Sequence, residues 1–374
     1  MKKQLALFLI ASLFMCACGP KASVSDESVP VTGQQEVTAK AKKTPKMKMS
    51  LMPQASGNPY ELLVVMGNDQ WERPVGRALF EVLDTDLPGV AQSERQFRIS
   101  RIDPQSYDTK YKIFRNILLI DIQAGVYTAP KMKFSRDLYA KNQMIMTLQA
   151  PDEASLAAML GTNGQQLLDF FNKSEINRLV KFLETNHNPV VAEKVHSQFG
   201  CEVWVPADLN KYKVGKDFFW CSNNTGSKDK SIVIYTYPYT SDKTFTLDYY
   251  VHKRDSVMKA NIPGGPEGSY MMTQDGLCYV EDATVKGEYA QVARGLWRIQ
   301  GDHMGGPFVA HSRVDIPNNR VVVIEGFVYA PESLKRNLIR LLEATLYTLQ
   351  LPTEHNVENF TYGLEEIAIT PGEE

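Results

Sequence analysis

The spacing of apolar residues predicts two folding regions that meet near residue 188. The first region alternates strands with helical segments, and its strands are expected at 60–66, 97–102, 117–122 and 143–148. The run Leu62–Val65 is apolar throughout, as in a strand that is covered on both faces. This order of strands and helices, with long crossovers, predicts a mixed sheet that has parallel members and covering helices.

Helical periodicity predicts two further features of this region. One helix follows the turn at 67–69 and continues to about Leu83, with Pro74 tolerated in its first turn. A short helix is expected to begin at Pro151. A separate long helix would then begin at a capping box formed by Thr162 and Gln165.

After residue 188 the pattern changes to shorter segments separated by turn residues. Strands are expected at 202–205, 218–222, 232–237, 277–283, 289–299, 308–314 and 320–329. A helix is expected at 243–259 and a final helix from Pro331. The final helix would bury Leu334, Leu338, Leu341 and Leu342 and keep Lys335, Arg336, Arg340 and Glu343 largely outside. We therefore expect an α/β domain at 57–188 and, at 189–374, an α+β domain with a mainly antiparallel sheet and a long C-terminal helix.

The first eighteen residues have the order of an export signal. Lys2 and Lys3 precede an apolar core at 5–15, which is shorter than the about 20 apolar residues that span a bilayer. Small Ala17 stands before Cys18, so residues 1–17 resemble a bacterial lipoprotein signal in which Cys18 becomes the lipidated N-terminus. An ordinary signal peptide cut near Ala17 is the alternative.

The segment at 18–56 is polar, has no helical or strand period, and predicts a disordered tether. Its lysines at 40, 42, 43, 46 and 48 form a basic run that suits either a solvated linker or contact with an anionic surface. We expect an exported protein, anchored in the cell envelope by the lipid on Cys18. Gly19 after the cysteine resembles signals that lead to the outer membrane, with the body facing the periplasm.

Composition narrows the classes of partner and chemistry. The chain has 374 residues, 43% of them hydrophobic, and a formal net charge of -2, so the basic bias of a nucleic-acid binder is absent. Cys201, Cys221 and Cys278 would remain after export. Cys201 and Cys221 suit a disulfide, or all three suit buried free thiols. No Cys/His spacing is typical of a zinc site, and neither a metal nor a cofactor is predicted.

The connection at 301–307 is the densest group of chemically capable residues. Its glycines and proline predict a tight, exposed turn that presents Asp302 and His303 together as an acid and an imidazole. Trp297, Gly305 and Gly306 flank this turn as candidate binding residues. The alternative is a turn whose polar residues bond their own backbone.

Glu325 lies in the middle of the apolar run at 321–328. A buried carboxylate requires a partner, because an unpaired one would become protonated. The partners considered are Arg294, Arg298, Arg313, Arg340 and His303. A structural ion pair, or a side chain turned toward solvent, competes with a catalytic role.

A third candidate group follows the strands of the first region. Asn68, Asp69 and Trp71 come after the first strand, and Asp121 ends the strand at 117–122. Ligands of open α/β sheets bind beyond the carboxyl ends of parallel strands, so these residues suit one shared crevice. Helix capping by Asn68 or Asp69, with Trp71 packed in the core or at its rim, is the alternative.

Several stretches of the chain together resemble those of a known family: 58–66 with Trp71 and Gly76, 115–121, 295–308, 325–331 and 335–336. The family that they resemble is the domain-of-unknown-function 4837 family of bacterial envelope lipoproteins. The resemblance extends over nearly all of the chain after the tether and implies export and lipidation. It implies no activity, cofactor or catalytic residue.

Three functions follow from these observations. The favoured one is a non-enzymatic binding or assembly factor that is held at the membrane through Cys18 and has an envelope protein as its candidate partner. The second is an envelope hydrolase that uses Asp302, His303 and Glu325 as acid or base. The third is a lipoprotein that binds a small ligand in the loops after the strands that end at Met66 and Asp121.

Overall fold

A computed structural model describes residues 51–354 and 370–371. The predicted export signal, Cys18 and the basic run of lysines lie outside the described residues. Gln54 and Ser56, expected at the end of the tether, already form bridges with Lys141 and Phe114. Ordered structure therefore begins before residue 57. All the elements below belong to one compact unit, 46–374.

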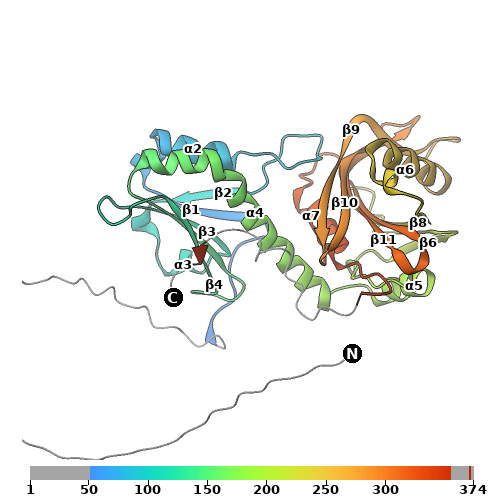
Figure 1. The fold of residues 1–374 in the computed structure, drawn as a ribbon, viewed down its shortest axis with the longest axis horizontal. Helices are drawn as coiled ribbons and strands as arrows, with labels where there is room; N and C mark the ends of the chain where they lie inside the picture. The colour runs from blue at the N-terminus through green and yellow to red at the C-terminus, as the bar shows by residue number, and fades with distance from the viewer. Residues whose placement is uncertain (1–50, 355–369, 372–374) are drawn as a thin grey trace, which may run out of the picture. The chain divides into compact units, whose positions relative to one another are not determined.

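The first sheet has six strands in the order β13–β4–β5–β3–β1–β2 (Figure 1). Its strands are β1 (Glu61–Val65), β2 (Arg98–Ile102), β3 (Asn116–Ile122), β4 (Lys131–Arg136), β5 (Met144–Ala150) and β13 (Thr370–Pro371). β1 is parallel to β2 and β3, and β3 is parallel to β5, whereas β4 is antiparallel to β5. The predicted mixed sheet is confirmed.

Helices cover both faces of this sheet. α1 (Asn68–Trp71) and α2 (Pro74–Leu83) connect β1 to β2, while η2 (Pro104–Ser106) and α3 (Thr109–Lys112) connect β2 to β3. Leu62 and Val64 pack on the face of α2 and the long helix α4 (Glu153–Thr185). Leu63 and Val65 pack on the opposite face, with Tyr107 and Tyr111. The uninterrupted apolar run of β1 follows from this double coverage.

α4 is one continuous helix, so the predicted break before Thr162 is wrong. The carboxylate of Asp152 caps it and accepts from the backbone N–H of Ser155 at 2.7 Å. The hydroxyl of Thr162 instead donates within the helix, to Ala158 O and Met159 O. At Gly164 a Cβ would lie 2.5 Å from Val82 Cγ2, so the glycine allows α2 and α4 to approach closely.

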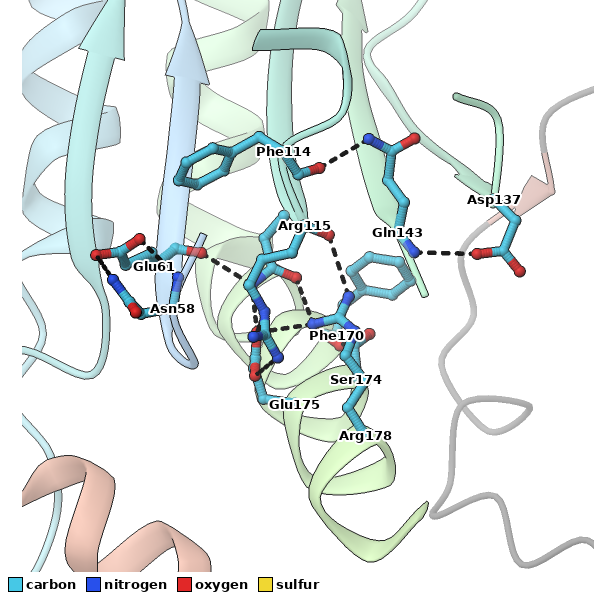
Figure 2. A network of polar contacts seen from close by, with 11 residues as sticks. Asn58, Glu61, Phe114, Arg115, Asp137, Gln143, Phe170, Ser174, Glu175 and Arg178 are labelled. Carbon is cyan, nitrogen blue, oxygen red and sulfur yellow. Dashed lines mark hydrogen bonds and ion pairs between the residues drawn. The ribbon is translucent and has the colours of Figure 1, made fainter. Parts of the chain in front are cut away.

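A buried carboxylate joins α4 to the start of β3 (Figure 2). Glu175 accepts two hydrogen bonds from Arg115, at 2.9 and 2.7 Å, and one from Arg178 at 2.7 Å. The amide of Asn116 adds a fourth at 2.5 Å, and Arg178 also reaches Asn116 Oδ1 and Arg115 O. Every charge in this network therefore has a partner, as burial of ionised groups requires.

The second sheet has seven strands, all antiparallel, in the order β6–β7–β8–β12–β11–β10–β9. They are β6 (Lys211–Gly215), β7 (Phe218–Ser222), β8 (Asp229–Pro238), β9 (Tyr270–Val285), β10 (Glu288–Gln300), β11 (Gly305–Asp315) and β12 (Arg320–Tyr329). The helical segments are α5 (Pro189–Phe199), η3 (Asp242–Phe245), α6 (Leu247–Asn261), η4 (Ile316–Asn318) and α7 (Arg336–Thr348). α5 and α7 pack on one face and α6 on the other. The predicted fold class is confirmed.

Two predicted elements of this half differ in the structure. The segment 202–205 is not a strand: Glu202 forms only an isolated bridge with Gln350, and Val203 and Val205 are buried in irregular chain. The final helix begins at Arg336 rather than Pro331, and Leu334 is 71% exposed. Its start is set by Glu94, whose carboxylate accepts from the backbone N–H groups of Lys335 and Arg336 at 2.8 and 3.1 Å.

The charged residues of α7 were expected outside, and the structure buries them. Lys335, Arg336, Arg340 and Glu343 are each at most 8% exposed. Arg340 and Arg294 both donate to the Glu343 carboxylate. Burial alone would raise the pKa of Glu343, but the two guanidinium groups outweigh it and lower the pKa to about 2. Ion pairing thus allows a charged helix face to be buried.

The cysteines of the second half are free thiols. Cys201 and Cys221 are buried in the apolar core beneath α5 and α7, and they form no disulfide. Burial raises the pKa of each thiol to about 12. Both therefore behave as small apolar side chains, the second of the two alternatives considered above.

Candidate functional site

The turn between β10 and β11 carries Asp302 and His303 at the surface. Asp302 Oδ1 accepts from the backbone N–H of His303 at 2.6 Å, and the Asp302 N–H donates to Ile299 O. His303 is exposed and Asp302 is partly exposed. The carboxylate therefore bonds the backbone of its own turn, as the simpler of the two interpretations expects.

The residues that flank this turn serve packing. Trp297 is 3% exposed, and its indole N–H donates to Val328 O at 3.2 Å. A Cβ at Gly306 would lie 2.0 Å from the same oxygen, and one at Gly305 would lie 2.8 Å from Trp297 O. Only glycine fits where these backbones approach each other so closely.

Glu325 lies far from Asp302 and His303. It stands opposite Ala310 in the β11–β12 register, five residues along β11 from Gly305 at the end of the turn. At roughly 3.3 Å per residue, that separation is about 17 Å. The three residues proposed as a hydrolytic acid and base set therefore do not form one site.

The partner of Glu325 is Arg254 of α6, which was not among the residues considered. Arg254 Nε and Nη2 donate to the two carboxylate oxygens at 2.9 and 2.7 Å, and both side chains have no exposed surface. Tyr250 donates to the same carboxylate at 3.3 Å. The guanidinium also lies 4.1 Å from the centre of the Phe308 ring. A planar fork that matches a carboxylate is the strongest geometry for such a pair.

A second link fixes the other side of the guanidinium. Arg254 Nη1 donates to Thr273 Oγ1 at 3.0 Å, and Thr273 in turn donates from its N–H and hydroxyl to Asp255. Burial raises the pKa of Glu325, and Arg254 opposes that rise. Because neither charged group reaches solvent, the pair holds α6 on the sheet and does not present reactive groups to a substrate.

The residues after β1 and β3 lie at the same edge of the first sheet, because β1 and β3 are parallel with Val65 opposite Leu119. They join different networks. The Asn68 N–H donates to Asp103 at the end of β2, Asp69 lies in the first turn of α1, and Trp71 contacts Phe80 and Arg101.

Asp121 lies within β3 and not beyond its end. It accepts from Gln123 Nε2 at 2.7 Å and from the Tyr127 hydroxyl, which also accepts from Gln149 at 2.8 Å. Burial, followed by the bond to Asp121 and the charge of Asp121, raises the pKa of Tyr127 to about 12, and the bond from Gln149 opposes that rise. In the described part of the chain, no hydrogen bond connects this network with residues 68–71, so the two groups are neighbours on one edge without a shared bonding network.

Beneath α7 the structure buries an uncharged imidazole. His311 of β11 has no exposed surface, and neither ring nitrogen has a hydrogen-bond partner among the described residues. Its ring lies edge-on to Tyr347, with centres 4.7 Å apart. Burial lowers the pKa of His311 to about 3; Glu343 opposes this change, and Arg294 and Arg313 reinforce it.

Within 51–354, no three His, Cys, Asp or Glu side chains group as metal ligands. No described helix is long and apolar enough to cross a membrane.

We expect Arg254→Met to destabilise the protein by about 3–5 kcal/mol, because it leaves the Glu325 carboxylate buried without a counter-charge. The double variant Arg254→Met with Glu325→Leu should recover much of that loss. Urea unfolding of the three proteins measures both effects. Arg77→Met is the control, because Arg77 and its partner Glu81 are exposed, and it should change stability by less than about 0.5 kcal/mol. Equal losses in the single and double variants would contradict the role of the charge.

We expect the stability of the protein to fall between pH 6.5 and 4.5, because the unfolded chain protonates His311 and the folded chain does not. The slope from this one proton is up to about 1.4 kcal/mol per pH unit. His311→Phe should flatten the slope in the upper part of this window, above about pH 5.5, where Glu343 of the unfolded chain is still largely ionised. His303→Phe, at an exposed position, should retain it. Unfolding free energies at several pH values test this, and identical slopes in wild type and His311→Phe would contradict it.

Two of the solved structures that match the chain are weakly similar to it. The Ran-binding protein Mog1p of Saccharomyces cerevisiae matches with 13% identity and a TM-score of 0.26, over 41% of this chain and 90% of that chain. A single-residue variant of protein Mog1 matches with 11% identity and a TM-score of 0.25, over 40% and 90%. These scores support no argument about fold or function. No curated protein matches the chain.

Comparison with family models divides the chain in two. Residues 55–184 match a domain of unknown function, DUF8532. Residues 188–348 match another domain of unknown function, DUF4837. The resemblance in sequence implied that DUF4837 covers nearly the whole folded chain. The DUF4837 match covers only the second half, and the first half matches DUF8532 instead. Residues 188–348 thus match the family that the sequence resembles, and the remainder of the folded chain does not.

Proposed function

We propose that this protein is an envelope lipoprotein whose folded body binds an extended segment of another envelope protein. The basic start, the short apolar core and the Ala17–Cys18 pair support export and lipidation. The polar segment that follows Cys18 would hold the body at a distance from the membrane surface.

The observation that carries the binding role is the outer edge of β9. This strand has 16 residues and pairs only with β10 among the described strands. Its first part is covered, because Met271 N–H donates to Ile262 O and Thr273 N–H donates to Asp255. From residue 278 to 284, after the irregular stretch 274–277 where the register with β10 shifts, no backbone partner other than β10 appears in the described chain. A free edge of this length is a template for an added strand.

Side chains along this edge indicate the chemistry of the partner. Leu277 and Tyr279 are 51% and 39% exposed, which offers apolar contact beside the free backbone groups. Three carboxylates line the same stretch: Asp275, Glu281 and Asp282. Asp275 and Glu281 approach Arg298 and Arg294 but remain mostly exposed. A basic, extended segment would complement this edge.

The hydrolase alternative has less support, because its acid and base candidates are separated. Glu325 is enclosed by Arg254 and Tyr250, and Asp302 bonds its own turn. The binding role needs no such convergence of catalytic groups.

We expect Cys18→Ala to release the protein from membranes and to stop its labelling with palmitate, since the thiol of Cys18 would carry the lipid. Cys16→Ala, two residues upstream, is the matched control and should leave both properties unchanged. Fractionation and metabolic labelling measure them. Continued labelling of the Cys18→Ala protein would contradict lipidation at this residue.

We expect Tyr279→Lys to remove at least nine-tenths of a partner protein that copurifies from cross-linked envelopes, because it adds positive charge to an edge that binds a basic segment. Tyr212→Lys is the matched control, since Tyr212 is a similarly exposed tyrosine on the opposite edge strand β6. Quantitative mass spectrometry measures the yield, and melting temperatures verify folding. A partner retained equally by both variants would contradict binding at β9.

A further inference from the structure

Three buried oxygen atoms lack partners where η3 meets the second sheet. They are Thr244 Oγ1, Gln291 Oε1 and Ser312 Oγ, in side chains that are each 1% exposed. Gln291 and Ser312 stand directly opposite each other on β10 and β11. The Gln291 amide also donates to the backbone oxygen of Phe245, the residue after Thr244. The strand register places Gln291 beside Ser312, and this bond places the Gln291 amide against η3, at the residue next to Thr244.

An unmet buried polar group costs about 1–3 kcal/mol, so folded proteins retain few of them. Three in one place indicate a position that something polar fills. Gln291 Oε1 only accepts hydrogen bonds, whereas each of the two hydroxyls accepts up to two and donates one. Because acceptor sites outnumber donor hydrogens in this group, the occupant should be rich in donors.

Aromatic rings and carboxylates surround this position. Phe245 and Tyr289 pack edge to face, with centres 5.0 Å apart, and Tyr239 lies against Phe245. The hydroxyls of Tyr239 and Tyr289 donate to Asp242 and Asp282, at 2.6 and 2.8 Å. Neither carboxylate has an ion pair within the described residues. Negative charge and ring faces together favour a cation over an anion.

We propose that this site binds a primary ammonium group on an aliphatic stem. An ammonium group has three donors and no acceptor, which matches three acceptor oxygens. The carboxylates of Asp242 and Asp282 supply the opposite charge, and the rings of Phe245 and Tyr289 enclose the stem. A planar guanidinium carries five donors in a fixed fork, which fits three oxygens contributed by separate elements less well.

The position of the site beside β9 identifies the carrier of the ammonium as a lysine, an assignment that rests on the proposed function. Asp282 of β9 stands opposite Gln291. Strands lie about 4.8 Å apart, so a strand added outside β9 would be about 10 Å from Gln291. The flexible four-carbon stem of lysine suits that gap, whereas a backbone amino terminus does not. η3 is a single turn whose N-cap, Ser241, forms no side-chain capping bond, and it would lift to admit the stem.

The test is calorimetric titration of the full-length protein, in detergent, with three small probes. They are Nα-acetyl-lysine methylamide, its uncharged norleucine analogue, and alanylalanine amide, which carries only an α-ammonium. We expect saturable binding of the lysine probe and none of the norleucine probe. Thr244→Val and Ser312→Ala should each weaken binding at least fivefold. Their melting temperatures should be equal or higher, because each removes an unmet buried hydroxyl. Thr353→Val, at an exposed position, is the control.

Different results would contradict different parts of this proposal. If the lysine probe does not bind, or binds Thr244→Val and Ser312→Ala as it binds wild type, the oxygens hold only buried water and the site is overturned. If alanylalanine amide binds as tightly as the lysine probe, the ammonium site stands and the assignment to lysine fails. Loss of the partner in Tyr279→Lys combined with absence of probe binding would overturn this site and leave the proposed function in place.

Discussion

The bidentate pair between Arg254 and Glu325 is the constraint on which the second half depends. Glu325 occupies the centre of β12, itself a central strand, and a lone carboxylate there would be protonated or would disrupt the sheet. Arg254 resolves this conflict only if α6 lies across the sheet at one position and one rotation. The ion pair therefore specifies where the helix docks, beyond whatever it adds to stability. The hydrogen bonds of Thr273 with Arg254 and Asp255 also fix the start of β9 relative to α6.

The first half uses the same physical solution at a different place. Glu175 of α4 is fully buried and receives the Arg115 guanidinium and the Asn116 amide from the start of β3, together with the Arg178 guanidinium of α4 itself. α7 repeats the arrangement, with Glu343 between Arg294 and Arg340. Apolar packing alone tolerates sliding of a helix over a sheet, because the hydrophobic effect has no direction. Charged pairs of fixed geometry remove that freedom.

Periodicity in the sequence predicted what local pattern controls. The continuous apolar run of β1 indicated a strand covered on both faces, and the alternating strands of the second half indicated an antiparallel sheet. Periodicity failed where a residue distant in the sequence determines the start of a helix or the partner of a buried charge. Glu94 sets the start of α7 from 241 positions away, and Arg254 reaches Glu325 across 71. Treating every charged residue of α7 as solvent-facing ignored that guanidinium groups can be buried when a carboxylate receives them.

The candidate site likewise has one part that local sequence predicted and one part that it did not. The glycines at 301–306 correctly indicated a tight turn, but a chemically rich turn is not yet a site. The unmet oxygens of Thr244, Gln291 and Ser312 come from three elements, and none belongs to a recognisable motif. A weak signal was present in the sequence, because polar Gln291 and Ser312 interrupt stretches that are otherwise apolar on one face of the sheet.

α4 takes part in the packing of both halves, although the two family matches separate at 184 and 188. Its first turns pack Leu156 and Leu160, and its middle packs Phe171, in the core of the first sheet. Its last turns pack Ile176, Val180 and Leu183 against β9, β10 and α7. A gene fusion or truncation made at the family boundary would keep every strand of the second sheet and still remove part of its hydrophobic contacts. In this chain, the boundary between the two family matches is therefore not a boundary between two separately packed cores.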